Sequence, residues 1–160
     1  MSNQGKASTL DQAQHETMLE YLSNSRHSER NTAIYLFTYR AGLRIGTVAG
    51  LRLNDVIDTS GKVKEVVNLH SSIVKGGKNY AAYINHPELR QAIKEYISVR
   101  PSGRPIEALF VSQKGNGFTS NSLSHLMLKL YGSAGFDGAS SHSGRRSFAT
   151  NILCSGVDIV

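Results

Sequence analysis

Apolar side chains recur along the chain at helical spacing in several separate stretches. The first covers residues 10–23, and Thr9 with Gln12 fits a capping box at its start. The second covers residues 29–41 and is followed by Gly42, a residue that commonly ends helices. Three more helices are predicted, one from Pro87, one from Thr119 or Ser120, and one over residues 142–155.

The pattern changes between the second and third helices. Residues 64–74 and 79–85 are rich in strand-forming and alternating apolar positions. Residues 75–78 lie between them and contain two adjacent glycines, which form tight turns at little conformational cost. These features predict a hairpin, and residues 108–111 predict a short buried extended segment. The predicted fold class is therefore mainly α with a small antiparallel β-sheet (α+β).

The 160 residues are enough for one domain with a hydrophobic core. We expect residues 1–8 to be a flexible lead-in and residues 9–160 to form that domain. No apolar run approaches the ~20 residues that a membrane span needs. The polar N-terminus also lacks the apolar region of a secretory signal. A soluble, cytoplasmic protein is the expectation.

Charge and cysteine content restrict the partners. The net charge of +6 favours an anionic partner, and nucleic acid is the commonest. Cys154 is the single cysteine, so no disulfide can form within the chain. The six histidines do not pair at metal-ligand spacing. We therefore expect no metal and no cofactor.

Four basic side chains stand out against this background. Arg44 lies between two apolar residues just after a glycine, and Lys75 lies in the turn of the hairpin. His142 and Arg145 are three residues apart, so on a helix they share a face and could bind one small anion. Each residue alone also fits an ordinary solvated surface position. Together, in a basic domain, they suit a phosphodiester.

Each of the four has a possible role in phosphoryl transfer. The guanidiniums of Arg44 and Arg145 can clamp phosphate oxygens and stabilise the charge of a pentacoordinate transition state. Lys75 could deliver a proton to a leaving 5′ oxygen. His142 could bond a phosphate oxygen or shuttle a proton. The sequence shows no carboxylate pair or metal cluster, which fits a metal-independent reaction.

The order of these motifs resembles the catalytic domain of the tyrosine recombinases, the phage-integrase family. Residues 41–45 and 51–56 are similar to the family's first arginine box, and residues 74–78 to its hairpin lysine segment. Residues 142–150 are similar to its second box, His-x-x-Arg followed by an aromatic, a small residue and Thr. The resemblance covers about residues 9–160.

The resemblance implies site-specific recombination or integration of double-stranded DNA by a bacterial or phage-encoded protein, typical of a mobile genetic element. In this family a tyrosine attacks a DNA phosphate, and the resulting 3′-phosphotyrosine is resolved by a 5′-hydroxyl. Other recombinase protomers on the DNA are the implied protein partners. The residues that match the catalytic motifs here are Arg44, Lys75, His142 and Arg145.

The chain departs from the family pattern at several positions. Thr47 stands where the family usually has an acidic residue, Tyr80 where it often has Arg, and Gly144 where it typically has Leu. We expect Gly144 to lose some helix packing and Tyr80 to lose a DNA contact. No tyrosine follows Arg145, where the family has its nucleophile. The seven tyrosines are Tyr21, Tyr35, Tyr39, Tyr80, Tyr83, Tyr96 and Tyr131.

Three interpretations stay open at this point. The first is a recombinase domain truncated before its nucleophile and inactive alone. The second is a non-catalytic DNA-binding regulator or competitor of a full-length recombinase. The third is an unrelated helical domain with coincidental basic motifs. On the first interpretation, Ile152 and Leu153 are expected to face water or a partner.

Overall fold

The computed structural model describes residues 7–70, 80–102 and 106–155. Its helices are α1 (Gln12–Ser23), α2 (Ser28–Ala41), α3 (Ile45–Gly50), α4 (Leu53–Val56), α5 (Pro87–Val99), α6 (Ser120–Ser133) and α7 (Ser143–Cys154), and its strands are β1 (Val66–Leu69) and β2 (Tyr80–Tyr83). The prediction of a mainly helical α+β fold with a small antiparallel sheet is confirmed. Within the described part, no helix is both long enough and apolar enough to cross a membrane.

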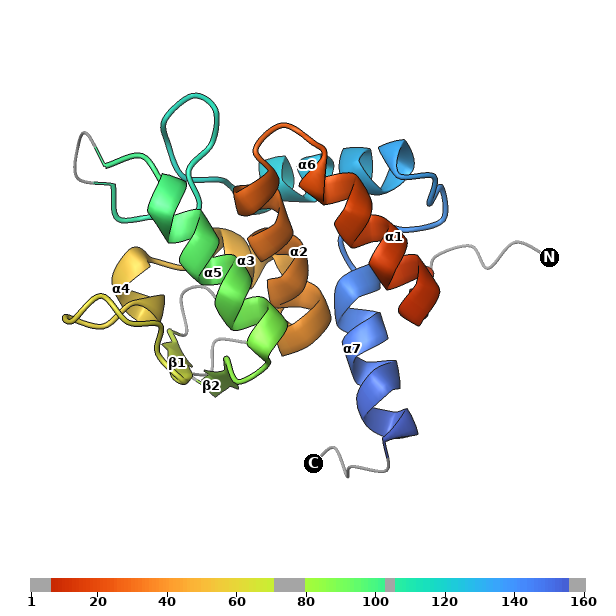
Figure 1. The fold of residues 1–160 in the computed structure, drawn as a ribbon, viewed down its shortest axis with the longest axis horizontal. Coiled ribbons are helices and arrows are strands. Elements are labelled where there is room, and N and C mark those ends of the chain that lie inside the picture. The colour runs from red at the N-terminus through yellow and green to blue at the C-terminus, as the bar shows by residue number, and fades with distance from the viewer. Residues whose placement is uncertain (1–6, 71–79, 103–105, 156–160) are drawn as a thin grey trace.

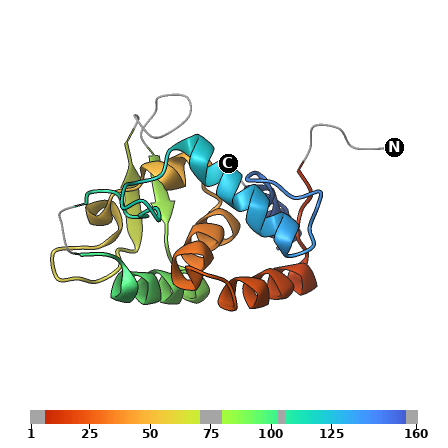
Figure 2. The same cartoon turned by 90° about the horizontal axis from the view of Figure 1, so that it is seen from above.

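Helix α2 is the central element of the fold. It contacts α1, α3, α5 and α7, and Figures 1 and 2 show it between these helices. Almost every residue from Arg30 to Tyr39 is buried, so α2 is covered all round rather than along one stripe. Helices α1 and α7, which lie near opposite ends of the described residues, both pack against α2 (Figure 1).

Aromatic packing attaches the extended segment at residues 108–111 to α2 and α5. Phe110 stacks on Tyr96 with ring centroids 5.2 Å apart and meets Phe37 edge-on at 5.8 Å. The buried Tyr96 hydroxyl donates to the Leu109 carbonyl at 2.9 Å and accepts from the Val111 N–H at 3.0 Å. The predicted buried segment is therefore present, and Tyr96 pairs two of its backbone groups.

The two paired strands of the predicted hairpin are present. β1 and β2 pair antiparallel, with Val66 opposite Tyr83 and Leu69 opposite Tyr80. Val67, Leu69 and Ala82 face the core. The predicted turn, including Lys75, falls in residues 71–79, which lie outside the described residues. The sheet stands at the edge of the molecule next to α4 and the start of α5 (Figure 1).

The start of α1 differs from the prediction. Asp11, not Thr9, is the N-cap, and its carboxylate accepts the Gln14 N–H at 2.8 Å while the Gln14 side chain accepts the Asp11 N–H at 2.9 Å. The capping box therefore lies two residues further along, since Asp caps at least as well as Thr. Leu10, just before the cap, is buried, and its N–H donates to Ser147 Oγ at 2.8 Å. This bond fastens the start of α1 to α7.

Two glycines allow α7 to approach α2 closely. Gly42 ends α2 with φ of +69°, and a Cβ there would overlap the ring of Phe148. Gly144 lies in the first turn of α7, and a Cβ there would overlap the Thr38 side chain of α2. The expectation that Gly144 loses packing is therefore wrong, because the missing side chain is what permits the contact. The approach places the end of α2 beside the start of α7.

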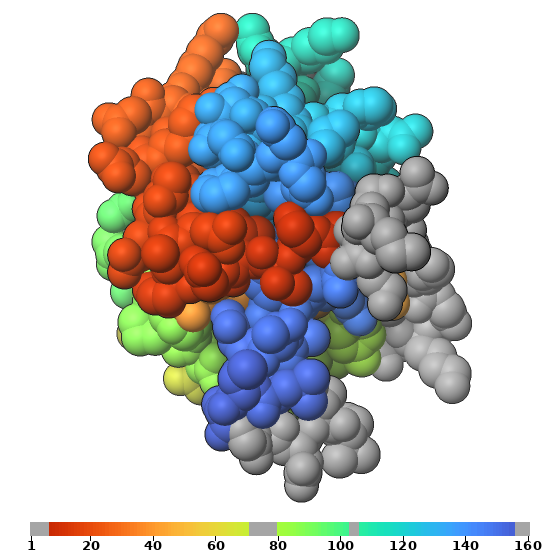
Figure 3. Space-filling view, turned by 90° about the vertical axis from the view of Figure 1, so that its right-hand side faces the viewer, coloured from red at the N-terminus to blue at the C-terminus, as the bar shows by residue number. Residues whose placement is uncertain are grey.

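The far end of α7 is at the surface, as Figure 3 shows in dark blue below α1 and α6. Leu153 is 65% exposed and Ile152 is half-buried, as expected. Cys154 is also exposed.

Candidate functional site

A cleft of about 760 Å³ opens where the end of α2, the strand β2 and the helix α7 meet. Segments far apart in the sequence converge here, because residues near positions 42, 82 and 148 line the cleft. Its lining residues include Arg40, Gly42, Arg44, Tyr80, Tyr83, Asn85, Arg145, Phe148 and Ile152. Two of the four predicted site residues, Arg44 and Arg145, therefore lie in one cleft.

The buried neighbours of Arg44 hold its backbone in place, whereas its side chain is exposed. It is the N-cap residue of α3 in an extended conformation, and its neighbours Leu43 and Ile45 are buried in the core. Its own side chain is exposed at the cleft. Among the described residues, no carboxylate lies within ion-pair distance of its guanidinium. The charge of Arg44 is therefore available to a ligand.

Arg145 enters the cleft from the first turn of α7. Ser143, Gly144 and Ser147 around it are buried against the core, which fixes the direction of the helix. Arg145 itself is half-buried, and burial is the main cause that lowers the pKa of its guanidinium. The positive charge of Arg44 lowers this pKa further, while the neighbouring Tyr80 raises it.

Two guanidiniums that repel each other in one cleft are stabilised by any anion that enters between them. Neither has an acidic partner in the described parts of the chain. Each also offers a planar set of N–H donors that matches the oxygens of a phosphate group. The arrangement can therefore accommodate an oxyanion such as a phosphate group between the two side chains.

The other two predicted site residues are placed differently. His142 is the N-cap residue of α7, exposed and one helical turn before Arg145, and it does not line the cleft. Lys75 lies outside the described residues. Their roles stay predictions. Thr47, where the family usually has an acid, is buried in α3. In the described residues, no three His, Cys, Asp or Glu side chains gather to hold a metal.

Comparison with known proteins excludes one of the three open interpretations. The model of the phage integrase family matches residues 8–160. The chain belongs to the phage integrase family. The interpretation as an unrelated helical domain is thereby excluded. The match covers both arginine boxes and the hairpin that separates them.

Relatives within the family are tyrosine recombinases. The chain is 30% identical over 141 residues to tyrosine recombinase XerD of Neisseria meningitidis serogroup A, covering 86% of this chain and 46% of that protein. It is 33% identical over 139 residues to tyrosine recombinase XerC of Myxococcus xanthus, covering 81% of this chain and 43% of that protein. The chain thus spans less than half the length of these curated relatives.

Solved structures of the family have the same fold. The XerA recombinase crystal structure matches 99% of this chain and 54% of its own, with a TM-score of 0.78 and 24% identity. A lambda integrase tetramer bound to a Holliday junction matches 98% of this chain and 46% of its own, with a TM-score of 0.70 and 16% identity. These likenesses confirm a tyrosine-recombinase catalytic-domain fold.

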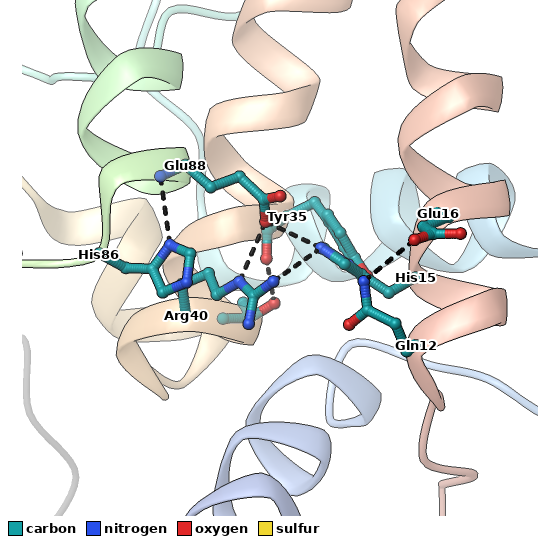
Figure 4. Close-up of polar contacts among 8 residues, drawn as sticks. Gln12, His15, Glu16, Tyr35, Arg40, His86 and Glu88 are labelled. Carbon is teal, nitrogen blue, oxygen red and sulfur yellow. Dashed lines mark hydrogen bonds and ion pairs between the residues drawn. The ribbon is translucent and has the colours of Figure 1, made fainter.

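Sequence reasoning missed a polar network behind the cleft, which Figure 4 shows. Glu88 at the start of α5 accepts from Arg40 Nε at 3.0 Å and contacts His15 Nε2 at 2.8 Å. His15 Nδ1 lies 2.7 Å from the Tyr35 hydroxyl, and the His15 ring stacks on Tyr39 at 3.9 Å between centroids. The network ties α1, α2 and α5 together near the end of α2, which Gly42 and Arg44 follow in the chain.

One signal in the sequence points to this network. His15, Met18 and Leu22 share one face of α1, so a histidine occupies a position in an otherwise apolar stripe. The partner carboxylate is 73 residues away, and nothing in the local pattern around Glu88 indicates the pairing. Arg40 is the link to the site, because it binds Glu88 and also lines the cleft.

Burial sets the charge state of the network. Burial is the main cause that lowers the pKa of His15 below its usual 6.5, against the opposing hydrogen bond with Glu88. Burial alone would raise the pKa of Glu88, but the hydrogen bonds from Arg40 and His15 outweigh it and lower that pKa. At neutral pH the network is therefore a neutral histidine between a carboxylate and a guanidinium.

We expect the free energy of unfolding to fall as the pH is lowered from 7 towards 5. Unfolded His15 titrates near 6.5, so below that pH the unfolded chain binds a proton that the folded chain does not. Burial lowers the pKa of His27 and of His86 as well, with the same sign. The substitution His15→Gln should make this pH dependence shallower, as measured by urea unfolding at a series of pH values. The control His125→Gln changes an exposed histidine of α6, and it should retain the wild-type dependence of unfolding free energy on pH. If the two variants show the same pH dependence, His15 is not its source.

Proposed function

We propose that this chain binds a scissile phosphate of double-stranded DNA in site-specific recombination of the tyrosine recombinase type. The observation that carries the proposal is the cleft in which Arg44 and Arg145 meet without an acidic partner among the described residues. The placement of two guanidiniums around one phosphate would neutralise the charge that develops in a pentacoordinate transition state.

The relatives support this choice of substrate. The matched proteins of Neisseria and Myxococcus are named tyrosine recombinases. One solved structure with the same fold is XerH recombinase bound to its difH substrate, and another is the lambda integrase tetramer on a Holliday junction. We propose the same kinds of partner here, namely duplex DNA and further recombinase protomers, in the cytoplasm.

The reaction would use the four predicted residues in distinct roles. A tyrosine oxygen attacks the phosphorus, the bond to the 5′ oxygen breaks, and a 3′-phosphotyrosine forms. Arg44 and Arg145 hold the non-bridging oxygens, with His142 as a further ligand or proton carrier. Lys75 protonates the leaving 5′ oxygen. No tyrosine follows Arg145 in this sequence, so we propose that residues 1–160 bind the phosphate but do not cleave alone.

Two measurements on one DNA preparation test the proposal. Fluorescence anisotropy with a labelled duplex should show binding that weakens steeply as salt rises, because phosphate contacts release counterions. A nicked suicide substrate should give no covalent adduct on a denaturing gel with these residues alone. An adduct would contradict the proposed inactivity, whereas absence of DNA binding at low salt would contradict the proposed function itself.

The cleft also fits a second candidate function, since binding of the phosphate does not itself require cleavage. In that case residues 1–160 would act as a non-catalytic regulator or competitor of a full-length recombinase. Adding this chain to an active recombinase reaction separates the two. Inhibition at stoichiometric occupancy of the DNA site supports the competitor, and stimulation of cleavage supports a role as a productive protomer.

A further inference from the structure

Arg40 is a third guanidinium at the cleft, and one side of it is held by other residues. Its Nε donates to Glu88 Oε1 at 3.0 Å, and its Nη2 lies 3.3 Å from His15 Nε2, as Figure 4 shows. The guanidinium carbon also lies 4.9 Å from the centroid of the Tyr39 ring, which is a cation–π contact. These three contacts fix the direction of the side chain, which a solvated surface arginine does not have.

The other side of Arg40 faces the cleft. Arg40 lines the cleft together with Arg44 and Arg145. Glu88 and His15, which hold its first side, do not line it. A guanidinium carries N–H donors on all three nitrogens, so the contacts through Nε and Nη2 leave Nη1 unused. Within the described residues, Nη1 forms no hydrogen bond, and its donors are therefore available to a ligand in the cleft.

The ion pair with Glu88 is compatible with binding of a further anion. The carboxylate occupies one edge of the planar guanidinium, and the remaining edges keep their donors. Because Glu88 already fixes the direction of Arg40, little side-chain freedom is lost when an anion binds to the other edge. Glu88 thus prepares Arg40 for a ligand, in the way that a preorganised site does.

We propose that Arg40 binds a second DNA phosphate, next to the one held between Arg44 and Arg145. Glu88 positions Arg40 for this contact. The inference rests on the proposed function, because the anion is taken to be DNA. The contacts with Glu88 and His15 hold Arg40 in its own place on the cleft wall, and the cleft of about 760 Å³ is larger than one phosphate group. The next phosphate of the same strand is the ligand that this arrangement fits.

The test removes the ion pair without changing the net charge of the protein. Arg40→Gln and Glu88→Gln are combined in one double variant, in which the amide that replaces the carboxylate can still pair with His15. The control combines Lys94→Gln with Glu95→Gln. It removes one exposed charge of each sign from α5, the helix that carries Glu88, away from the residues that line the cleft. Thermal melting checks that both double variants fold.

DNA affinity is then compared by anisotropy with a mixed-sequence duplex over a range of salt concentrations. The Arg40 and Glu88 double variant should bind about 10-fold more weakly at a fixed salt concentration, because charge-assisted hydrogen bonds to a phosphate are lost. Its slope of log K against log salt should be shallower by about 0.9, the value for one phosphate contact. The Lys94 and Glu95 control should match the wild type in both quantities.

A measurement on the wild type does not depend on the folding of any variant. In an NMR titration with the same duplex, the Arg40 Nε–H signal should shift as the DNA binds, whereas the Arg90 Nε–H signal should stay in place. Arg90 is the matched control because it also extends from α5 towards a polar environment, donating to the carbonyls of Val63, Lys64 and Ile84, but does not line the cleft.

The outcomes distinguish failure of this inference from failure of the proposed function. Wild-type affinity and salt slope in the Arg40 and Glu88 double variant would overturn the role of Arg40 and leave the proposed function intact. An Arg40 signal that stays in place while binding saturates would do the same. Equal losses in the two double variants would also overturn it, since they would report a general effect of surface charges. Absence of DNA binding by the wild type would overturn both.

Discussion

Replacing Arg44 and Arg145 together with glutamine is expected to weaken binding to duplex DNA by about 100-fold or more. Each guanidinium contributes charge-assisted hydrogen bonds worth roughly 1.5–3 kcal/mol, and the two act on one phosphate. The slope of log K against log salt should become shallower by about 0.9, the value for one phosphate contact on duplex DNA. Anisotropy titrations at several salt concentrations measure both quantities.

The control for this prediction is Lys94→Gln with Lys129→Gln. These lysines are exposed on α5 and α6, away from the residues that line the cleft, and the double substitution removes the same amount of positive charge. It should lower the affinity only slightly. If both double variants lose affinity equally, the protein binds DNA through its general charge, and the cleft has no special role.

Substitution of Gly144 by alanine is expected to destabilise the fold by about 1–3 kcal/mol, the usual range for overpacking a tight interface. The added Cβ would overlap the Thr38 side chain and press on the backbone of α2. Because α7 carries Arg145, the same displacement should also weaken DNA binding. Chemical denaturation measures the first effect and anisotropy the second.

Two further variants make this prediction specific. Gly132 lies in α6, and a Cβ there meets nothing within 4 Å, so Gly132→Ala should be neutral or stabilising. Thr38→Ala removes the hydroxyl that lies nearest to the new Cβ, so it should partly rescue Gly144→Ala. Full stability of Gly144→Ala without the second change would show that α2 and α7 are not packed as tightly as described.

Local sequence patterns predicted most of the fold, because each helix and the hairpin depend mainly on residues that are close together in the sequence. The apolar periodicity gave the helices, and the alternation around the two glycines gave the hairpin base. The spacing of the motifs also identified Arg44 and Arg145, and the fold brings them into one cleft. Arg44 and Arg145 come together because α7 packs on α2. The family resemblance implied this packing, whereas apolar periodicity gives no information about which helices are in contact.

Long-range packing was beyond local patterns. The network of His15, Arg40 and Glu88 joins three helices, and apart from His15 in the apolar stripe of α1 its members look like ordinary polar positions in the sequence. The role of Gly144 depends on Thr38, which is more than a hundred residues earlier. The expectation that Tyr80 loses a DNA contact stays a prediction; the structure adds that its side chain lines the cleft with Arg44 and Arg145.

The central claim is that Arg44 and Arg145 bind the DNA phosphate together. The most direct measurement is an NMR titration of the labelled protein with duplex DNA that follows the side-chain Nε–H signals of both arginines. The account predicts that both signals shift over the same range of DNA concentration and return when salt is added. Unchanged arginine signals, at DNA concentrations where anisotropy reports saturated binding, would contradict it.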